Sequence, residues 1–154
     1  PCKSAYELID KNFEICFDNT DEESRDYLGK VSSVVYFSRN GLTEPEIWGL
    51  VRMLTKSQPE EAMKIKIYSF LKAYTMQVTG MHSFSHAIYK DVVFARYIQS
   101  KSESTRWHYA MARYFNQLPP CDRKLQALPY HLEEAGSWSR VKNCLTDIEM
   151  FQLW

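Results

Sequence analysis

The sequence predicts a mainly α-helical chain, in which a winged-helix domain with a small β-hairpin is followed by a helical, α-solenoid-like arm. Apolar residues recur at intervals of three and four positions along most of the chain, which is the pattern of amphipathic helices. Residues 75–86 are the one stretch typical of extended structure, with two short runs of β-branched and aromatic residues separated by Thr79-Gly80. After residue 100, short helical patterns joined by tight turns follow one another without strands, as in an α-solenoid.

The first helix is expected over residues 4–17, because its apolar residues recur at helical spacing. Thr20 and Glu23 are expected to form a capping box that starts a second helix, whose apolar face runs from Tyr27 to Tyr36. That helix is expected to end within residues 38–41, where Asn40 or Gly41 can take the left-handed conformation.

Residues 43–46 (TEPE) predict another capping box, with Pro45 in the first turn, where its missing N–H costs nothing. Residues 57–60 (SQPE) repeat this pattern and begin a fourth segment that reaches Tyr74. Two structures stay open for this segment. The alternation of Ile65 and Ile67 with lysines is typical of a strand, whereas the length of the segment favours a helix.

In the hairpin, Gly80 can supply the positive φ of a tight turn, and the second strand leads directly into a helix over residues 87–98. The next helix stops before Pro119-Pro120. Two more helices are expected over residues 121–135 and 137–145, with Gly136 as the C-terminal cap and Ser137 as the following N-cap. Thr146 and Glu149 predict one further capping box.

These patterns predict three parts of the chain. Residues 1–19 are a linker helix from a preceding domain, residues 20–100 form the winged-helix domain, and residues 101–154 form the helical arm that leads towards repeats. The chain begins at Pro1 without an initiator Met and stops at Trp154 inside an apolar helical pattern, which predicts a piece of a longer protein.

Composition indicates a globular, intracellular protein. With 45% hydrophobic residues, 5 Gly and 6 Pro in 154 residues, the chain can bury a substantial core. Four widely spaced cysteines without a CxxC pair indicate free thiols in a reducing compartment. No apolar run approaches the length of a membrane span, and no signal peptide is present, so we expect a cytoplasmic location without a membrane partner.

The sequence holds none of the common catalytic motifs. It contains no GxxxxGK[ST] loop, GxSxG elbow, HExxH or paired CxxC, so we expect neither catalysis nor a cofactor in this chain. His82 and His86 would share a face on a helix, but on a strand they lie about 13 Å apart. With no Cys, Asp or Glu close in sequence, we expect no metal site there. Two pairs of carboxylates could suggest acid–base catalysis: Asp147 with Glu149, and Glu133 with Glu134. Ordinary capping and a solvated helix face account for both pairs.

A winged helix also raises the possibility of nucleic-acid binding, in which the third helix would enter the major groove. Four lysines would have to make the contacts: Lys56, Lys64, Lys66 and Lys72. Glu60 and Glu61 are on the same segment. The hairpin tip carries no cation, and 19 basic residues are balanced by 19 acidic ones. This balance argues against a surface that neutralises phosphates.

His86 is the candidate binding residue. It lies where the hairpin meets the next helix, near a helix N-terminus, where backbone N–H groups and the helix dipole favour an anion. The alternative is a partly buried histidine hydrogen-bonded to a backbone group.

Motifs lie in three stretches of the chain: residues 38–47 (SRNGLTEPEI), residues 84–115, which contain FSH, RYI and WHYAMARYF, and residues 128–138 (LPYHLEEAGSW). Their order and spacing resemble the region that follows the ATPase domain in NACHT-type STAND P-loop ATPases. The resemblance is to their nephrocystin, telomerase-associated-protein and NACHT–WD or tetratricopeptide-repeat group. It extends roughly from residue 28 to residue 154, and three motifs in register are more specific than any one of them.

The resemblance implies that the winged helix closes over ADP or ATP bound by a preceding NACHT domain, with the histidine of the FSH motif, His86, contacting the β-phosphate of ADP. The chain would then couple nucleotide state to protein interactions of downstream repeats. Its partners would be the NACHT domain, those repeats and other proteins. The alternative function is a helical protein-interaction module that does not depend on nucleotide, and the third is a winged-helix nucleic-acid binder.

Overall fold

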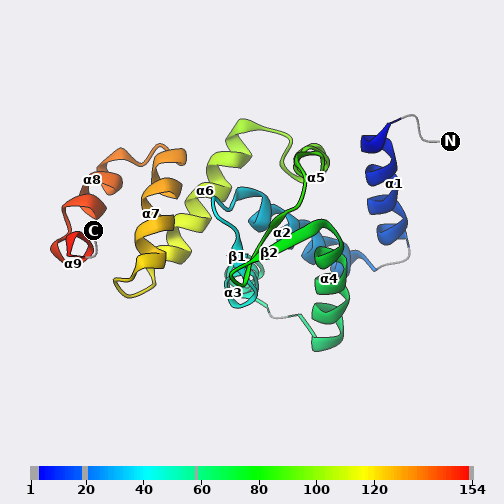
Figure 1. The fold of residues 1–154 in the computed structure, drawn as a ribbon, viewed down its shortest axis with the longest axis horizontal. Coiled ribbons are helices and arrows are strands. Elements are labelled where there is room, and N and C mark those ends of the chain that lie inside the picture. The colour runs from blue at the N-terminus through cyan, green and yellow to red at the C-terminus, as the bar shows by residue number, and fades with distance from the viewer. Residues whose placement is uncertain (1–3, 19–20, 58, 153–154) are drawn as a thin grey trace. The chain divides into compact units, whose positions relative to one another are not determined.

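A computed structural model of the chain describes residues 4–18, 21–57 and 59–152. These residues form helices and one small antiparallel sheet, which confirms the predicted mainly α-helical class. The chain divides into two compact units, Pro1–Gln99 (unit 1) and Ser100–Trp154 (unit 2), each with its own buried residues. Figure 1 labels helices α1 to α9 and strands β1 and β2.

Unit 1 begins with α1 (Ala5–Asp18), which packs on later helices through a buried aromatic residue. Phe13 is fully buried and lies edge-on to Phe70 of α4, with ring centroids 4.9 Å apart. Arg96 holds the same helix by its side chain, because its Nε donates to Asp10 Oδ1 at 2.5 Å and its Nη2 donates to the Asp10 carbonyl at 2.8 Å. Helix α1 is therefore part of unit 1.

Helix α2 (Glu22–Phe37) supplies much of the core of unit 1, with Leu28, Val31, Val34 and Val35 buried. Its N-cap is Asp21, which accepts a hydrogen bond from the Ser24 N–H at 2.7 Å. The expected cap at Thr20 lies outside the described residues.

The prediction that a left-handed residue ends α2 is wrong. Helix α2 ends at Phe37, and its C-cap Ser38 is extended. Gly41 does have a φ of +83°, but it serves the turn before β1 (Leu42–Thr43). A Cβ atom on Gly41 would lie 2.9 Å from the carbonyl oxygen of His82, so the turn and β3 approach more closely than a side chain permits.

Helix α3 (Glu44–Thr55) begins with the predicted capping box, which is confirmed. Glu46 Oε2 accepts from the Thr43 N–H at 2.8 Å, and Thr43 Oγ1 accepts from the Glu46 N–H at 3.4 Å. Pro45 lies in the first turn, as expected. The helix ends at Lys56, whose φ of 57° is left-handed.

Helix α4 (Glu61–Tyr74) resolves the open alternative in favour of a helix. The cap expected in residues 57–60 is wrong, because the N-cap is Glu60 and makes no side-chain capping bond. The helix starts too far along the chain for Ser57 to reach its first N–H groups. The Ser57 hydroxyl instead lies 2.6 Å from the hydroxyl of Tyr27.

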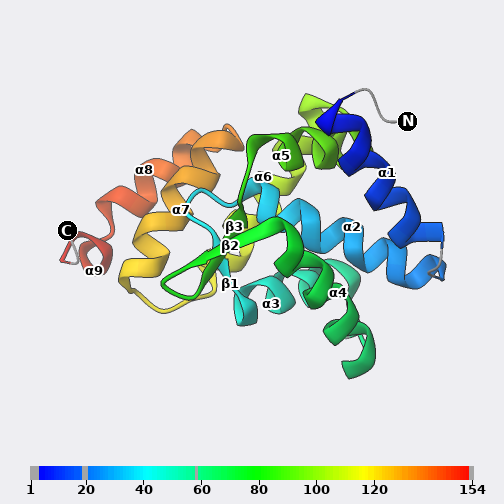
Figure 2. The same cartoon turned by 45° about the vertical axis from the view of Figure 1, so that its right-hand side comes forward.

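The sheet of unit 1 has the order β1-β3-β2, and every pairing is antiparallel. β2 (Thr75–Val78) and β3 (Met81–Phe84) form the predicted hairpin, visible in Figure 2, and the register sets Val78 opposite Met81. Thr79 and Gly80 both have positive φ in the turn, 50° and 81°. The sequence missed β1, which consists of two residues and pairs with β3.

After β3 the chain forms α5 (Ala87–Val93) and then a single π-helical turn, η1 (Phe94–Ile98), where an uninterrupted α-helix was expected. The Gln99 N–H donates to the Phe94 carbonyl at 3.0 Å, five residues back, which defines the π turn. Tyr97 of this turn packs on α2, because a Cβ atom on Gly29 would lie 3.1 Å from its ring.

Unit 2 is a succession of helices: α6 (Lys101–Asn116), α7 (Asp122–Glu134), α8 (Trp138–Thr146) and α9 (Ile148–Phe151). Each packs against the one before it, and the core contains Met111, Phe115, Leu128, Leu132 and Met150. The boundaries agree with the predicted helices to within a few residues, except that α6 starts at Lys101, capped by the Ser100 hydroxyl.

One of the three caps predicted for unit 2 is wrong, the capping box at Thr146. Gly136 has the expected positive φ, 68°, after α7. Ser137 is the N-cap of α8, as expected, although its side chain makes no capping bond. Because α8 continues through Thr146, the break falls one residue later than expected and Asp147 is the N-cap of α9. The Thr146 hydroxyl donates to the Lys142 carbonyl within α8 instead.

Candidate functional site

His86 is exposed at the start of α5, where it acts as the N-cap of that helix. Its Nδ1 accepts a hydrogen bond from the Ile88 N–H at 3.2 Å. An imidazole that accepts at Nδ1 carries its proton on Nε2 when it is neutral. The ring therefore offers an N–H donor at Nε2, while Nδ1 is already occupied by the backbone.

His82 occupies a different environment, in the core of unit 1, where it is 1% exposed. Its Nε2 lies 2.9 Å from the Tyr68 hydroxyl and its Nδ1 lies 3.4 Å from Thr75 Oγ1. Burial lowers the pKa of His82, with a smaller lowering from Lys72 and an opposing effect of Glu44. His82 thus joins α4, β2 and β3 as a neutral core residue. No group of three or more metal-ligating side chains occurs among the described residues.

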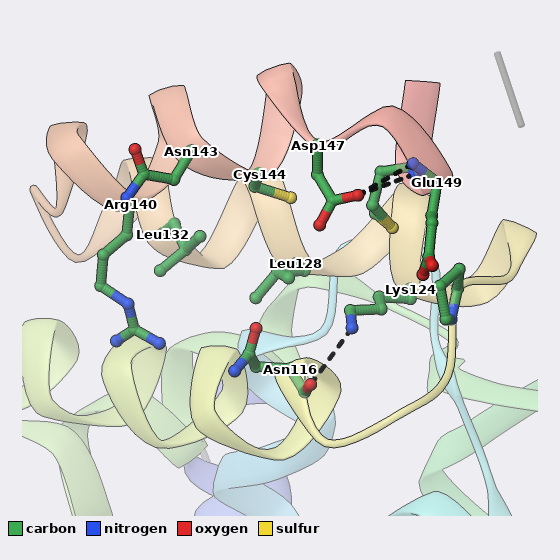
Figure 3. Close-up of a pocket in the computed structure, with 11 residues that line it drawn as sticks. Asn116, Lys124, Leu128, Leu132, Arg140, Asn143, Cys144, Asp147 and Glu149 are labelled. Carbon is green, nitrogen blue, oxygen red and sulfur yellow. Dashed lines mark hydrogen bonds between the residues drawn. The ribbon is translucent and has the colours of Figure 1, made fainter. Parts of the chain in front are cut away.

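A groove of about 310 Å³ lies within unit 2, between the end of α6, α7 and the α8–α9 segment (Figure 3). Its apolar lining comes from Leu128 and Leu132 of α7 and Met150 of α9. The rest of its lining is mostly polar: Asn116, Pro120, Lys124, Arg140, Asn143, Cys144, Asp147 and Glu149.

The charged groups that line the groove are held in place by neighbouring groups. Lys124 Nζ donates to the carbonyls of Asn116 and Leu118 at 3.2 and 2.8 Å. The guanidinium of Arg140 lies over the Tyr109 ring, 5.5 Å from its centroid. Asp147 Oδ1 accepts from two N–H groups at the start of α9. Fixed side chains of both signs suit a groove that recognises a polar partner.

Cys144 also lines the groove, and its thiol is half-buried. Burial raises the pKa of this thiol, Asp147 raises it further, and Lys124 opposes the change. The thiol is therefore protonated at neutral pH, which makes it a poor nucleophile.

Helix α8 has its apolar face outside. No residue of α8 is buried, while Ile148 and Phe151 of the next helix are 71% and 66% exposed. At about 100° per residue, the helix separates two sets of side chains. Apolar Trp138, Val141 and Leu145 lie on one side, and groove-lining Arg140, Asn143 and Asp147 lie on the other. We call Trp138 and Leu145 of α8, together with Ile148 and Phe151 of α9, the apolar face of α8–α9; all four side chains are exposed, and none of them lines the groove.

A buried histidine pair in unit 2 was not found from the sequence. His108 of α6 and His131 of α7 are both buried, and the His131 ring stacks on Phe115 with an interplanar angle of 3°. Both belong to motifs that were noticed for their family resemblance, but helical spacing gives no sign that they meet. Their role is to join α6 to α7.

Comparisons with known proteins give one limited similarity. The chain is 24% identical over 147 residues to a protein described as a TPR repeat-containing protein from Dictyostelium discoideum. The similar region is 95% of this chain but 8% of that protein, so the chain spans a small part of its relative's length. No family model matches the chain, and no solved structure matches it.

The relative's description agrees with a helical chain, and it gives no support to the NACHT and STAND resemblance in particular. In the described part of the chain, no helix is both long enough and apolar enough to cross a membrane.

Proposed function

We propose that this chain is a helical protein-interaction module, in which the apolar face of α8–α9 packs against an amphipathic α-helix. The observation that carries the proposal is the exposure of four large apolar side chains on two successive helices, Trp138 and Leu145 on α8 and Ile148 and Phe151 on α9. Large exposed apolar patches are characteristic of interaction sites, and residues at this spacing match the anchors that one helix presents to another.

The arrangement of unit 2 supports a helix as the occupant. Within unit 2, α7 packs on α6, α8 on α7 and α9 on α8, so its helices stack in series. The similar Dictyostelium protein is described as containing TPR repeats, which are helix–turn–helix units stacked in series. Lys142, which is exposed on α8 beside the apolar face, favours a helix with acidic residues along its edge. The proposal gives the chain no catalytic role.

Titration of the 154-residue chain with a labelled synthetic helix tests the proposal. The peptide carries Leu at positions i, i+3, i+4 and i+7 with Glu at its flanks, and anisotropy reports binding. We expect micromolar binding that weakens at least 10-fold on Ile148→Lys, because a charge would be buried in the interface. Ile65→Lys is the matched control, since Ile65 is equally exposed, at 62%, but lies on α4 of unit 1.

A peptide of the same composition with its apolar residues scattered should not bind. Equal binding of both peptides, or unchanged binding by Ile148→Lys, would contradict an interaction at the apolar face of α8–α9.

A second candidate is the regulatory coupling of a STAND-type ATPase. The order α2–β1–α3–α4–β2–β3 supports a winged-helix assignment for residues 20–100. In this order a short strand follows the first helix, two more helices come next, and a β-hairpin follows the third helix. In this proposal residues 1–19 link to a preceding NACHT domain that binds ATP or ADP, and residues 101–154 lead to repeats. The exposed His86, with an N–H donor at Nε2, would contact the β-phosphate of ADP.

ADP retention by the longer parent protein tests this second proposal. His86→Ala should speed ADP release and change oligomerisation, because a phosphate contact of the ADP state is lost. His86→Asn keeps a side chain that can cap α5, so it separates loss of the cap from loss of the phosphate contact. Unchanged retention and oligomerisation in His86→Ala would remove the sensor role.

A further inference from the structure

We infer that the free edge of β2 pairs with β2 of a second copy of this chain, joining two three-stranded sheets. This inference concerns unit 1 and does not depend on the function proposed for unit 2. β2 is an edge strand in the order β1-β3-β2, and no strand among the described residues pairs with its other side.

Apart from its short length of four residues, the edge lacks the features that keep edge strands from pairing. Natural edge strands are protected by charged side chains, proline, bulges or a covering segment. The sequence of β2, TMQV, has no charge and no proline, and its register with β3 is continuous from Thr75 to Val78. Met76, Gln77 and Val78 are exposed, so nothing in the described part of the chain covers them.

The hydrogen bonds of the hairpin show which backbone groups are directed to the free edge. The Ser85 N–H donates to the Tyr74 carbonyl at 3.0 Å, so this pair is hydrogen-bonded. Hydrogen-bonded and non-hydrogen-bonded pairs alternate along an antiparallel ladder. Met76 and Val78 therefore bond to β3, whereas the N–H and C=O of Gln77 are directed to the free side.

The two faces of the sheet restrict the register of a second copy. His82 and Phe84 of β3 are buried, so Gln77, opposite His82, lies on the core side of the sheet. Met76 and Val78 lie on the outer side. Residues opposite each other in antiparallel strands share a face, as a two-fold axis perpendicular to the sheet requires. Because the Thr75 N–H already donates to the Leu71 carbonyl, Gln77 is the residue of β2 with both backbone groups available, and we place the axis between Gln77 and Gln77 of the second copy.

This register is self-complementary in three respects. The two Gln77 residues exchange both N–H···O=C bonds as a hydrogen-bonded pair. Met76 of each copy lies opposite Val78 of the other, which makes two apolar cross-strand pairs on the outer face. No charged residue opposes another, because β2 and its turn are uncharged. The same register thus satisfies the hydrogen bonds, the sheet faces and the charges.

The size of the contact sets its strength. Two strands of four residues bury far less than the roughly 1,200 Å² of a stable interface. We therefore expect a weak dimer, with a dissociation constant on the order of 0.1–1 mM. Sedimentation equilibrium or concentration-dependent NMR shifts of β2 amides can measure association in this range.

Charge substitution at the two-fold axis tests the pairing. Gln77→Lys and Gln77→Glu each place like charges opposite each other and should weaken self-association at least 5-fold. An equimolar mixture of the two variants should restore it, because the mixed dimer pairs opposite charges. Ala62→Lys, exposed in the first turn of α4 at the opposite end of that helix from β2, adds the same charge and should associate as the unsubstituted chain does.

All measurements use chains that carry Ile148→Lys, so that the apolar face of α8–α9 does not contribute. Gln77 is exposed, and the unchanged circular dichroism of each variant will confirm that it folds. A monomeric parent at 1 mM, unaffected single variants, or a mixture no stronger than its components would each overturn the inference.

Discussion

The Nδ1 atoms of His108 and His131 lie 3.1 Å apart in the core of unit 2. One nitrogen must donate and the other must accept, so at least one imidazole is neutral, and when both are neutral they are in opposite tautomers. Burial lowers the pKa of both residues, that of His131 to about 3. His108 and Arg123 further lower the pKa of His131, while Glu134 opposes the lowering at His108.

Unit 2 should lose stability in mild acid. Above the unfolded-state pKa of about 6.5, His131 is neutral in both the folded and the unfolded chain, and its contribution to the free energy of unfolding is fully present. Below that pH the unfolded chain binds a proton that the folded chain excludes, until the pH reaches the folded-state pKa of about 3. In this range His131 lowers the free energy of unfolding by about 1.4 kcal/mol per pH unit, which amounts to about 2 kcal/mol at pH 5. Urea unfolding followed by circular dichroism at pH 7.5 and pH 5 measures the loss.

His131→Phe should reduce that pH dependence, because the group that excludes the proton is gone. Equal stability of the unsubstituted chain at the two pH values would refute the prediction.

Gly41→Ala should destabilise unit 1 more than Gly80→Ala does. Both glycines have φ near +80°, so each alanine incurs the cost of a left-handed conformation, about 1–2 kcal/mol. Only at Gly41 does the new Cβ meet backbone, the His82 carbonyl oxygen at 2.9 Å, whereas nothing lies within 4 Å of it at Gly80. We expect a total cost of about 3 kcal/mol or more at Gly41. Denaturant midpoints give the comparison, and equal costs would contradict the close approach.

Thr79→Asn should stabilise the hairpin by about 0.5–1 kcal/mol. Thr79 is β-branched and has a φ of 50°, a conformation that asparagine adopts with less strain. Thr79→Val is the matched control, because it keeps the branch and removes the hydroxyl that donates to the Val78 carbonyl at 2.7 Å. Thermal unfolding should place asparagine above threonine and valine below it. A lower midpoint for Thr79→Asn would show that the turn does not strain Thr79.

Arg96→Met should loosen α1 from unit 1. The guanidinium makes two hydrogen bonds to Asp10 in a partly buried position, and their loss should cost about 1–3 kcal/mol of local stability. Faster amide hydrogen exchange in α1 is the expected readout. Arg96→Lys should recover only part of the protection, because an ammonium group cannot reproduce the two-point contact.

The matched control for Arg96→Met is Lys64→Met, which breaks the pair with the exposed Glu61 at 3.1 Å and should cost less than about 0.5 kcal/mol. If α1 exchanges equally fast in both variants, the contact of Arg96 with Asp10 does not hold the helix.

Local patterns in the sequence predicted the helices and the hairpin, because helical periodicity and the Thr79-Gly80 turn are properties of neighbouring residues. Capping residues were harder to place. The capping box at Thr43 was predicted correctly. The caps predicted at Ser57 and Thr146 are wrong, because α4 has its N-cap three residues later, at Glu60, and α9 has its N-cap one residue later, at Asp147. Strand β1 escaped notice because two residues show no period.

The features that involve several elements could not be read from the sequence. The groove takes its lining from α6, α7, α8 and α9, and the pairing of His108 with His131 depends on how α6 packs on α7. The position of His86 at a helix start was predicted, since it follows from its place in the chain. Its role in binding nucleotide remains a proposal.

The π-helical turn η1 (Phe94–Ile98) has one residue more than a regular α-helical turn would need, and two contacts depend on that residue count. Within it, Arg96 bonds to α1 and the adjacent Tyr97 packs on Gly29 of α2. Deleting one residue between Phe94 and Ile98 would restore a regular α-helix and rotate one of these side chains away from its contact by about 100°. A one-residue deletion in this segment is therefore expected to cost one of the two contacts.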